Sequence, residues 1–248
     1  MNLINYYEEL SFSEWPSHET LFYDNWIIRI SDGYTKRANS INTIYGNGEV
    51  ELYEKLNFCE DLFHKANIKP TFKLTILDQN KYLDSILEKR GYEIVEPSVV
   101  MKRDLDLTYN ISNLNYQIFS NLDINWLDEF AKVKKMNNQD RSNFQIISEK
   151  ISGIVFHIIL KDNNNDIVSL GTGAIQRNQL GILNIHTVEN SRSIGYGSKL
   201  MNIILSEGVK FGAKASYLQV VKNNKAASKL YTNLGYSEVY EYWYRVKS

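Results

Sequence analysis

The hydrophobic and polar positions in the second half of the chain follow two spacings in a regular order. β-Branched and aromatic residues that alternate with polar ones predict strands, and apolar residues three and four positions apart predict helices. The predicted strands are 116–119, 154–160, 167–176, 181–188, 217–221 and 236–246, and the predicted helices are 124–133, 142–150, one from 198 to Gly208 or Gly212, and 225–233. Asp123 can cap the first of these helices. The order predicts an α/β fold with a mixed sheet.

The first half of the chain repeats much of this layout. The pattern there predicts strands 23–31, 36–45, 71–77 and 92–103 and helices 50–66 and 82–90. Gly91-Tyr92 follows a helix as Gly235-Tyr236 does, and Gly46-Asn47-Gly48 precedes a long helix at a similar separation. Such self-similarity predicts a diverged internal repeat, with one domain over 1–107 and another over 108–248. An unrelated α/β domain in the first half is the alternative.

One short stretch, Arg-Ser-Ile-Gly-Tyr-Gly from Arg192 to Gly197, stands where a helix of the second half begins. Glycines at a helix start let the backbone come close to an anion, and the unpaired N–H groups of the first turn converge on that anion. The stretch therefore predicts a phosphate-binding turn.

Two common phosphate-binding motifs do not fit this turn. A Walker loop needs Lys-Ser or Lys-Thr directly after its last glycine, whereas Gly197 is followed by Ser198-Lys199. A dinucleotide fingerprint needs a third glycine where Leu200 stands and an acidic residue at the end of the next strand, which 218–220 lacks. Another ligand has to be considered.

Two motifs of the second half resemble the GNAT acyl-CoA N-acyltransferases. The turn is similar to that family's pyrophosphate-binding motif, Gln/Arg-x-x-Gly-x-Gly/Ala, and the segment from Leu218 to Tyr236, with Asn224 and Leu230-Tyr231, is similar to its next strand and helix. The resemblance covers residues 108–248 and implies a GNAT fold, with two GNAT-like halves in tandem. In the first half, Trp15-Pro16, Trp26 and Arg37-Ala38-Asn39-Ser40 are similar to the beginning of tandem GNAT proteins.

The resemblance implies acetyl-CoA as the cofactor and assigns its contacts. The pyrophosphate would lie on the N–H groups of 194–198, the pantetheine arm beside the backbone of 185–187, and Asn224 near the pantetheine or the phosphates. Tyr231 matches the family's general acid. The residues assigned in this way are Ile185, His186, Thr187, Arg192, Ser193, Ile194, Gly195, Tyr196, Gly197, Ser198, Asn224 and Tyr231. No metal is expected.

Acyl transfer from a thioester to an amine also needs a base for the amine. A phenol with a pKa near ~10 can protonate a thiolate with a pKa near ~8.5, which suits Tyr231 as the acid. His186 is the first candidate for the base because imidazole titrates in a useful range, and Glu189 or a water chain are alternatives. Core packing for Tyr231 and His186 and simple helix capping for Asn224 are the structural alternatives.

The corresponding turn in the first half lacks these features. Thr43 stands in the place of Arg192, and Glu49 and Glu51 put carboxylates at the helix start, where they would repel a pyrophosphate. The first half is therefore predicted to be a degenerate, cofactor-free GNAT-like domain that shapes the acceptor side.

Composition narrows the class of protein. The chain has 248 residues, 43% of them hydrophobic, and a net charge of -1, which allows real cores and argues against a nucleic-acid partner. The first nine residues lack basic residues and a sustained apolar stretch, and no segment approaches the ~20 apolar residues that span a bilayer, so a cytoplasmic protein without a membrane partner is expected. The single cysteine, Cys59, falls in phase with Leu56 and Phe63 and is predicted to be buried.

Two functions are compatible with these observations. The favoured one is an acetyl-CoA-dependent N-acetyltransferase that acts on a primary amine of a small molecule or peptide. The alternative is a non-catalytic acyl-CoA-binding or interaction module. Both predict that CoA binds, and both leave the oligomeric state open.

Overall fold

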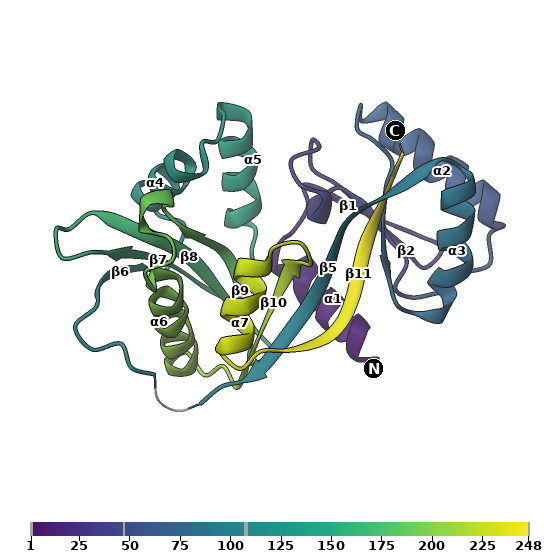
Figure 1. The fold of residues 1–248 in the computed structure, drawn as a ribbon. Helices are drawn as coiled ribbons and strands as arrows, with labels where there is room; N and C mark the ends of the chain where they lie inside the picture. Colours follow the sequence, from purple (N-terminus) through teal and green to yellow (C-terminus); the bar gives the residue numbers. More distant parts are fainter. Residues whose placement is uncertain (1, 47, 107–108, 248) are drawn as a thin grey trace. The chain divides into compact units, whose positions relative to one another are not determined.

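The chain divides into two compact units in a computed structural model that describes residues 2–46, 48–106 and 109–247 (Figure 1). Unit 1 contains the described residues up to Val100, Val221–Asn223 and the described residues from Val239 onward. Unit 2 contains the described residues from Met101 to Val220 and Asn224–Glu238. The predicted boundary between 107 and 108 lies outside the described residues. The contacts place the larger part of the last strand in unit 1, whereas the predicted second domain runs to residue 248.

Unit 1 is built on a mixed sheet. It begins with α1 (Leu3–Glu14), the antiparallel strands β1 (Glu19–Tyr23) and β2 (Trp26–Ile30), the 3-10 helix η1 (Lys36–Ala38) and β3 (Ser40–Asn42). Then follow α2 (Leu52–Lys65), β4 (Thr71–Thr75), α3 (Asp78–Lys89) and β5 (Tyr92–Asp104). β4 pairs in parallel with β3 and antiparallel with the last strand, β11 (Ser237–Lys247).

The core of unit 1 lies between this sheet and the helices α2 and α3. Trp26, Phe72 and Phe63 are fully buried there and come from β2, β4 and α2. Cys59 belongs to the same core, and burial raises the pKa of its thiol to about 12. The predicted buried cysteine is confirmed.

Three features of unit 1 differ from the sequence prediction. α1 is not predicted, because its buried face includes the carboxylates of Glu8 and Glu14, which hide the apolar period. The predicted strand 23–31 is instead the second half of a hairpin, because Asp24 and Asn25 have φ values of 44° and 68° and turn the chain. The predicted strand 36–45 is shortened to β3, because η1 occupies its beginning.

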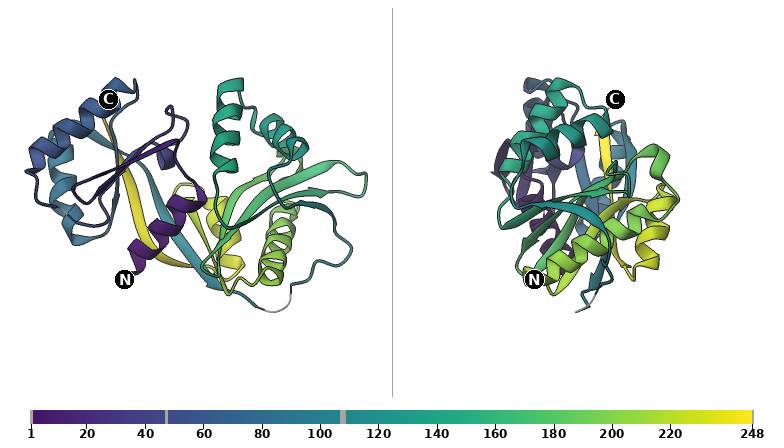
Figure 2. Two further views of the ribbon diagram at one scale, coloured as in Figure 1. Left: turned by 180° about the vertical axis from the view of Figure 1, so that it is seen from behind. Right: turned by 90° about the vertical axis from the view of Figure 1, so that its left-hand side faces the viewer.

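Unit 2 has the element order that the sequence predicts. Its elements are β6 (Asn115–Phe119), α4 (Ile124–Lys134), α5 (Asn138–Glu149), β7 (Ile154–Lys161), β8 (Ile167–Gln176), β9 (Gln179–Thr187), η2 (Glu189–Ser191), α6 (Tyr196–Lys210), β10 (Ala215–Val221) and α7 (Lys225–Asn233). Strands β6 to β9 form an antiparallel meander, and β10 pairs in parallel with β9. Figures 1 and 2 show α4 and α5 on one side of this meander and α6 on the other.

Local signals account for the ends of the helices in unit 2. The side chain of Asp123 accepts a hydrogen bond from the N–H of Asn125 at 2.8 Å, which confirms it as the cap of α4. Gly212, with φ of 88°, follows the last turn of α6, as one of the two predicted stops requires. Gly208 lies inside the helix instead, where an added Cβ would come within 2.5 Å of Leu180 on β9. This glycine lets α6 pack closely on the sheet.

None of the helices in the described ranges is both long enough and apolar enough to cross a membrane.

Candidate functional site

A groove of about 810 Å³ opens in unit 2 beside the predicted phosphate-binding turn. Three segments form its walls: the end of β9, the turn that leads into α6, and α7 with its N-cap. Its lining residues are Ile185, His186, Thr187, Arg192, Ser193, Gly195, Gly197, Ser198, Asn224, Ala226, Ala227, Lys229, Leu230, Tyr231 and Asn233. Arg192 and Lys229 are cationic, and no lining residue is acidic. The groove therefore favours an anionic ligand.

The turn between η2 and α6 leaves a helix N-terminus open. Gly195 is the N-cap with φ of 93° and no side-chain cap, and Ser193 also lies in the left-handed region with φ of 65°. The first described intrahelical bond runs from the N–H of Lys199 to the carbonyl of Gly195 at 3.1 Å. The N–H groups before it point out of the helix, and the first turn carries no acidic residue. This is the geometry of an anion site.

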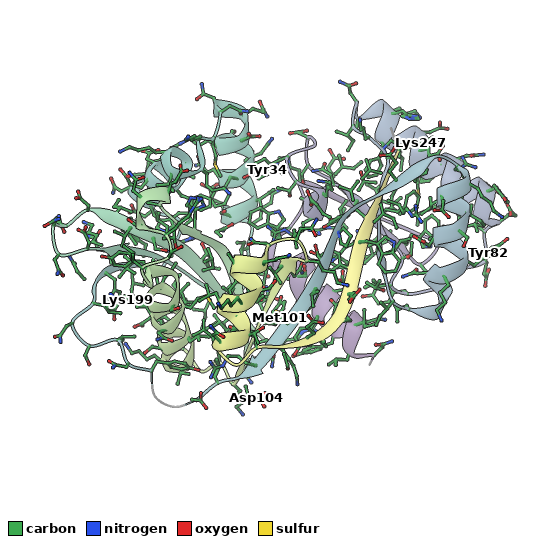
Figure 3. All side chains as sticks on the ribbon, in the orientation of Figure 1. Tyr34, Tyr82, Met101, Asp104, Lys199 and Lys247 are labelled. Atoms are coloured by element: carbon green, nitrogen blue, oxygen red, sulfur yellow. The ribbon has the colours of Figure 1, made fainter. Side chains whose placement is uncertain are left out.

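Two further observations fix the surroundings of the turn. An added Cβ on Gly197 would lie 3.3 Å from Leu230 on α7, so this glycine lets the start of α6 approach α7. Figure 3 labels Lys199, whose ammonium lies 4.9 Å from the ring centre of Tyr196 in the same turn. Lys199 thus adds a second positive charge to the first turns of α6.

Strand β9 leaves its neighbour β10 where it reaches the groove. Their parallel pairing runs from Gln179 and Ala215 to Ile182 and Leu218. On the other side of β9, the register with β8 shifts between Leu170 and Thr172, so two residues of β9 stand opposite one of β8. A bulge of this kind bends a strand, here with the pairing to β8 resumed at His186 and Thr187. The backbone of 185–187 therefore faces the groove along an open edge.

Arg192 connects the turn to this edge. Its Nε donates a hydrogen bond to the carbonyl of Thr187 at 3.2 Å, and the side chain remains exposed. The hydroxyl of Thr187 lies 3.1 Å from that of Ser169 on β8. These contacts hold the end of β9 beside the phosphate-binding turn.

Tyr231 comes from α7 and lines the groove while it is 8% exposed. Burial raises the pKa of its phenol to about 12, so the group keeps its proton at neutral pH. Its ring packs edge-on against Tyr236 at 6.0 Å, and the hydroxyl of Tyr236 is 2.6 Å from that of Ser216. At the end of α7, Arg103 donates to the carbonyl of Leu234. The helix that carries the phenol is anchored on both sides.

Asn224 is the N-cap of α7. Its Oδ1 accepts a hydrogen bond from the N–H of Ala227 at 3.1 Å, and both residues line the groove. The capping alternative for Asn224 is therefore correct, and it is compatible with a ligand contact.

His186 is half-buried on β9 and lines the groove. Burial lowers the pKa of its imidazole below the usual range, and the positive charges of Lys134 and Arg192 add to that shift. The ring is consequently neutral at pH 7 and can accept a proton. Glu189 lies outside the groove lining, on the exposed helix η2.

The structure gathers most of the predicted ligand contacts around one groove. Of that set, Ile194 and Tyr196 do not line it, and the side chain of Ile194 is 63% exposed. The backbone N–H role of both residues stays a prediction. The sequence analysis names Leu230 only as part of the motif and does not name Lys229; both lie beside Tyr231 on α7 and line the groove, as the helical period could have indicated.

The corresponding region of unit 1 is filled by carboxylates of the chain itself. Glu51 is the N-cap of α2 and accepts hydrogen bonds from the N–H groups of Tyr53 and Glu54. Asp24 accepts from the N–H groups of Glu49 and Val50 at 2.8 and 3.0 Å. These contacts occupy the donors that an anion would need. Asn47, in the glycine turn before α2, lies outside the described residues.

Sequence comparison adds a family assignment to this geometry. A family model described as "Probable histone acetyltransferase Rv0428c C-terminal" matches residues 4–245. The chain belongs to this family. A curated relative from Bacillus subtilis (strain 168), described as "Uncharacterized N-acetyltransferase YobR", is 27% identical over 258 residues and is matched over 100% of both chains.

Solved structures show the same fold. A GCN5-related N-acetyltransferase from Kribbella flavida superposes with a TM-score of 0.74 at 13% identity, over 100% of this chain and 96% of the other. A tandem GNAT protein from the clavulanic acid biosynthesis pathway gives a TM-score of 0.59 at 10% identity, over 78% of this chain and 69% of the other. The predicted GNAT resemblance and the mixed α/β GNAT fold are confirmed.

Proposed function

We propose that the protein is an acetyl-CoA-dependent N-acetyltransferase that acts on a primary amine of a small molecule or peptide. One observation carries the proposal: a single groove contains the open N-terminus of α6, the unpaired edge of β9 and the protonated phenol of Tyr231. The N-acetyltransferase relative and the family assignment support the reaction class.

The residues of the groove fit CoA. The open N–H groups of the first turn of α6, together with Arg192, suit a pyrophosphate, and the groove lining has no carboxylate that would repel it. The edge of 185–187 that faces away from β8 suits a peptide-like arm, since an extended ligand can pair with a strand edge. The volume lies in the ordinary range for cofactor sites.

Each residue then has a stated task. Acetyl-CoA, when bound, supplies a thioester whose acyl carbon the amine attacks. The edge of β9 orients the reacting end, and Tyr231 donates a proton to the departing sulfur, which its raised pKa allows because the phenol is not ionised. His186, neutral because burial lowers its pKa, accepts the proton that the amine gives up.

A binding and turnover experiment tests this proposal. Calorimetry measures CoA affinity, and thiol release from acetyl-CoA is followed with a panel of small amines and amino-terminal peptides. We expect binding and turnover on at least one amine. Tyr231→Phe should lower kcat by about 10²-fold, the contribution of one proton-transferring group, with CoA affinity unchanged.

The controls separate the alternatives. Tyr116→Phe removes a partly buried phenol from β6, outside the groove, and should leave kcat unchanged. Tight CoA binding without turnover on any amine would instead support a non-catalytic acyl-CoA-binding module. Absence of CoA binding contradicts both functions.

A further inference from the structure

A row of three polar side chains crosses the meander of unit 2 next to the groove. Nδ2 of Asn184 on β9 lies 3.3 Å from Oγ1 of Thr172 on β8, and that oxygen lies 3.0 Å from Nδ1 of His157 on β7. Thr172 and His157 are 0% exposed, and Asn184 is half-buried. None of the three lines the groove.

The step from Asn184 to Thr172 has a defined direction. The amide nitrogen of Asn184 can only donate, so it donates to Thr172, and the threonine hydroxyl is then free to donate to His157. Burial lowers the pKa of His157 to about 4, so its ring is neutral at pH 7 and Nδ1 can accept. Nε2 of His157 is buried and has no hydrogen-bond partner among the described residues; its ring lies 4.5 Å from that of Trp126. The row therefore ends inside the core and cannot carry protons to solvent.

Its other end lies at the bulge of β9. Asn184 has φ of 57°, in the left-handed region that side-chain-bearing residues rarely adopt. Thr172 pairs with Leu183, directly before the bulge, and Leu170 pairs with His186, directly after it. Gly171 stands opposite, and an added Cβ there would come within 2.7 Å of Ile185. The Asn184 to Thr172 bond thus ties the two strands together at the irregular step.

We propose that Asn184, Thr172 and His157 form a positioning network that holds the bulge of β9, and thereby the edge 185–187, in the geometry that the groove requires. The buried imidazole is the fixed partner of the threonine hydroxyl, and the oxygen of that hydroxyl accepts from the amide of Asn184. The expected effect on CoA binding and turnover rests on the proposed function, whereas the expected effect on the backbone of β9 does not.

Five variants test the network. Thr172→Val removes the hydroxyl and keeps the shape, and Thr172→Ser restores the hydroxyl. Asn184→Gly removes the side-chain amide and keeps the left-handed backbone conformation accessible. Asn184→Ala removes the amide and also makes that conformation unfavourable. Ile175→Val shortens a buried side chain near the far end of β8 and is the control for lost packing alone.

Hydrogen exchange of the free protein gives the first readout. Thr172→Val and Asn184→Gly should speed amide exchange over 183–188 by about tenfold, which corresponds to one lost hydrogen bond, and Thr172→Ser and Ile175→Val should not. Asn184→Ala should exchange at least as fast as Asn184→Gly. Wild-type exchange in Asn184→Gly would show that only the backbone angle matters and would overturn the network.

Ligand binding and kinetics give the second readout. Thr172→Val and Asn184→Gly should weaken CoA binding and raise KM for acetyl-CoA by about tenfold, with a smaller change in kcat. Thr172→Ser should keep the wild-type values. An equal loss in Ile175→Val would reduce the effect to general destabilisation and contradict the proposal. If wild-type protein does not bind CoA, the proposed function fails, and the exchange result still decides the network.

Discussion

The histidines on β7 and β9, the two strands that flank β8, differ in burial and therefore in what each can do. His186 is half-buried and lines the groove, whereas His157 is fully buried beside Trp126. Burial lowers the pKa of both, more strongly for His157, because desolvation disfavours the charged ring. Of these two rings, only that of His186 is in reach of a ligand in the groove. The sequence analysis names His186 as the candidate base, but the sequence alone does not show that His157 is the histidine buried inside the sheet.

The pH dependence of turnover tests the role of His186. Because its pKa is lowered, the ring is neutral above pH ~6.5 and gains a proton only below that value. We expect kcat/KM to fall as the pH drops through a midpoint below ~6.5, and His186→Gln to lower kcat by about 10²-fold and to remove this limb. Glu189→Gln, on the exposed helix η2, is the control and should keep both rate and limb. An unchanged limb in His186→Gln would assign the base to another group.

At the scale of elements, the sequence pattern predicts unit 2 well because α4, α5 and α6 each bury an apolar face, and β7 and β8 are nearly continuous buried runs. The bulge of β9 escapes such reasoning, since Asn184 in a left-handed conformation looks like any other polar residue in a strand. Its partners Thr172 and His157 belong to other strands, and only the register brings them together. Conversely, the glycine turn before α6 is visible in the sequence because the open helix start needs glycine at Gly195.

The start of α6 lacks the stabilisation that a side-chain cap would give, and its N–H groups stay open to a ligand. The uncapped first turn of α6 would be stabilised by an acidic residue at its third position, because a carboxylate there interacts favourably with the helix dipole and can accept from the open N–H groups. We expect Ser198→Glu to raise the free energy of unfolding by about 0.3–1 kcal/mol and to abolish CoA binding, because the carboxylate takes the N–H groups that a pyrophosphate needs. Denaturant unfolding and calorimetry measure the two effects.

A matched charge controls for long-range electrostatics. Asn163→Glu adds the same charge in the exposed turn between β7 and β8, far along the chain from the groove segments, and should change neither quantity measurably. Loss of stability in Ser198→Glu, or retained CoA affinity, would contradict the assignment of an open anion site to this helix start.

At the scale of the whole molecule, each unit has a helix that follows a glycine turn, and the two helices begin differently. The N–H groups at the start of α2 in unit 1 are bound by carboxylates of the chain, whereas the start of α6 in unit 2 has no side-chain cap. The sequence predicts the difference from Thr43, Glu49 and Glu51, and it misses Asp24, which lies far away in the chain and reaches the turn through the β1–β2 hairpin. Hydrogen bonds from Lys55 and from the N–H of Glu49 lower the pKa of Asp24 to about 2, so its carboxylate stays charged at neutral pH. The absence of a cofactor site in unit 1 stays a prediction that these contacts support.

The number of CoA sites per chain follows from this asymmetry. We expect calorimetry to give one site, and Arg192→Glu in unit 2 to remove it, because the reversed charge would repel the phosphates at the open turn. Asp24→Asn should leave CoA affinity unchanged and lower the thermal midpoint, because it weakens the ion pair with Lys55, which is 2.8 Å long and formed by a fully buried ammonium. Glu51→Gln should likewise leave affinity unchanged, because its oxygen can still accept from the first turn of α2. Two sites in the wild-type chain, or a loss of affinity in either unit 1 variant, would show that the first unit takes part in cofactor binding.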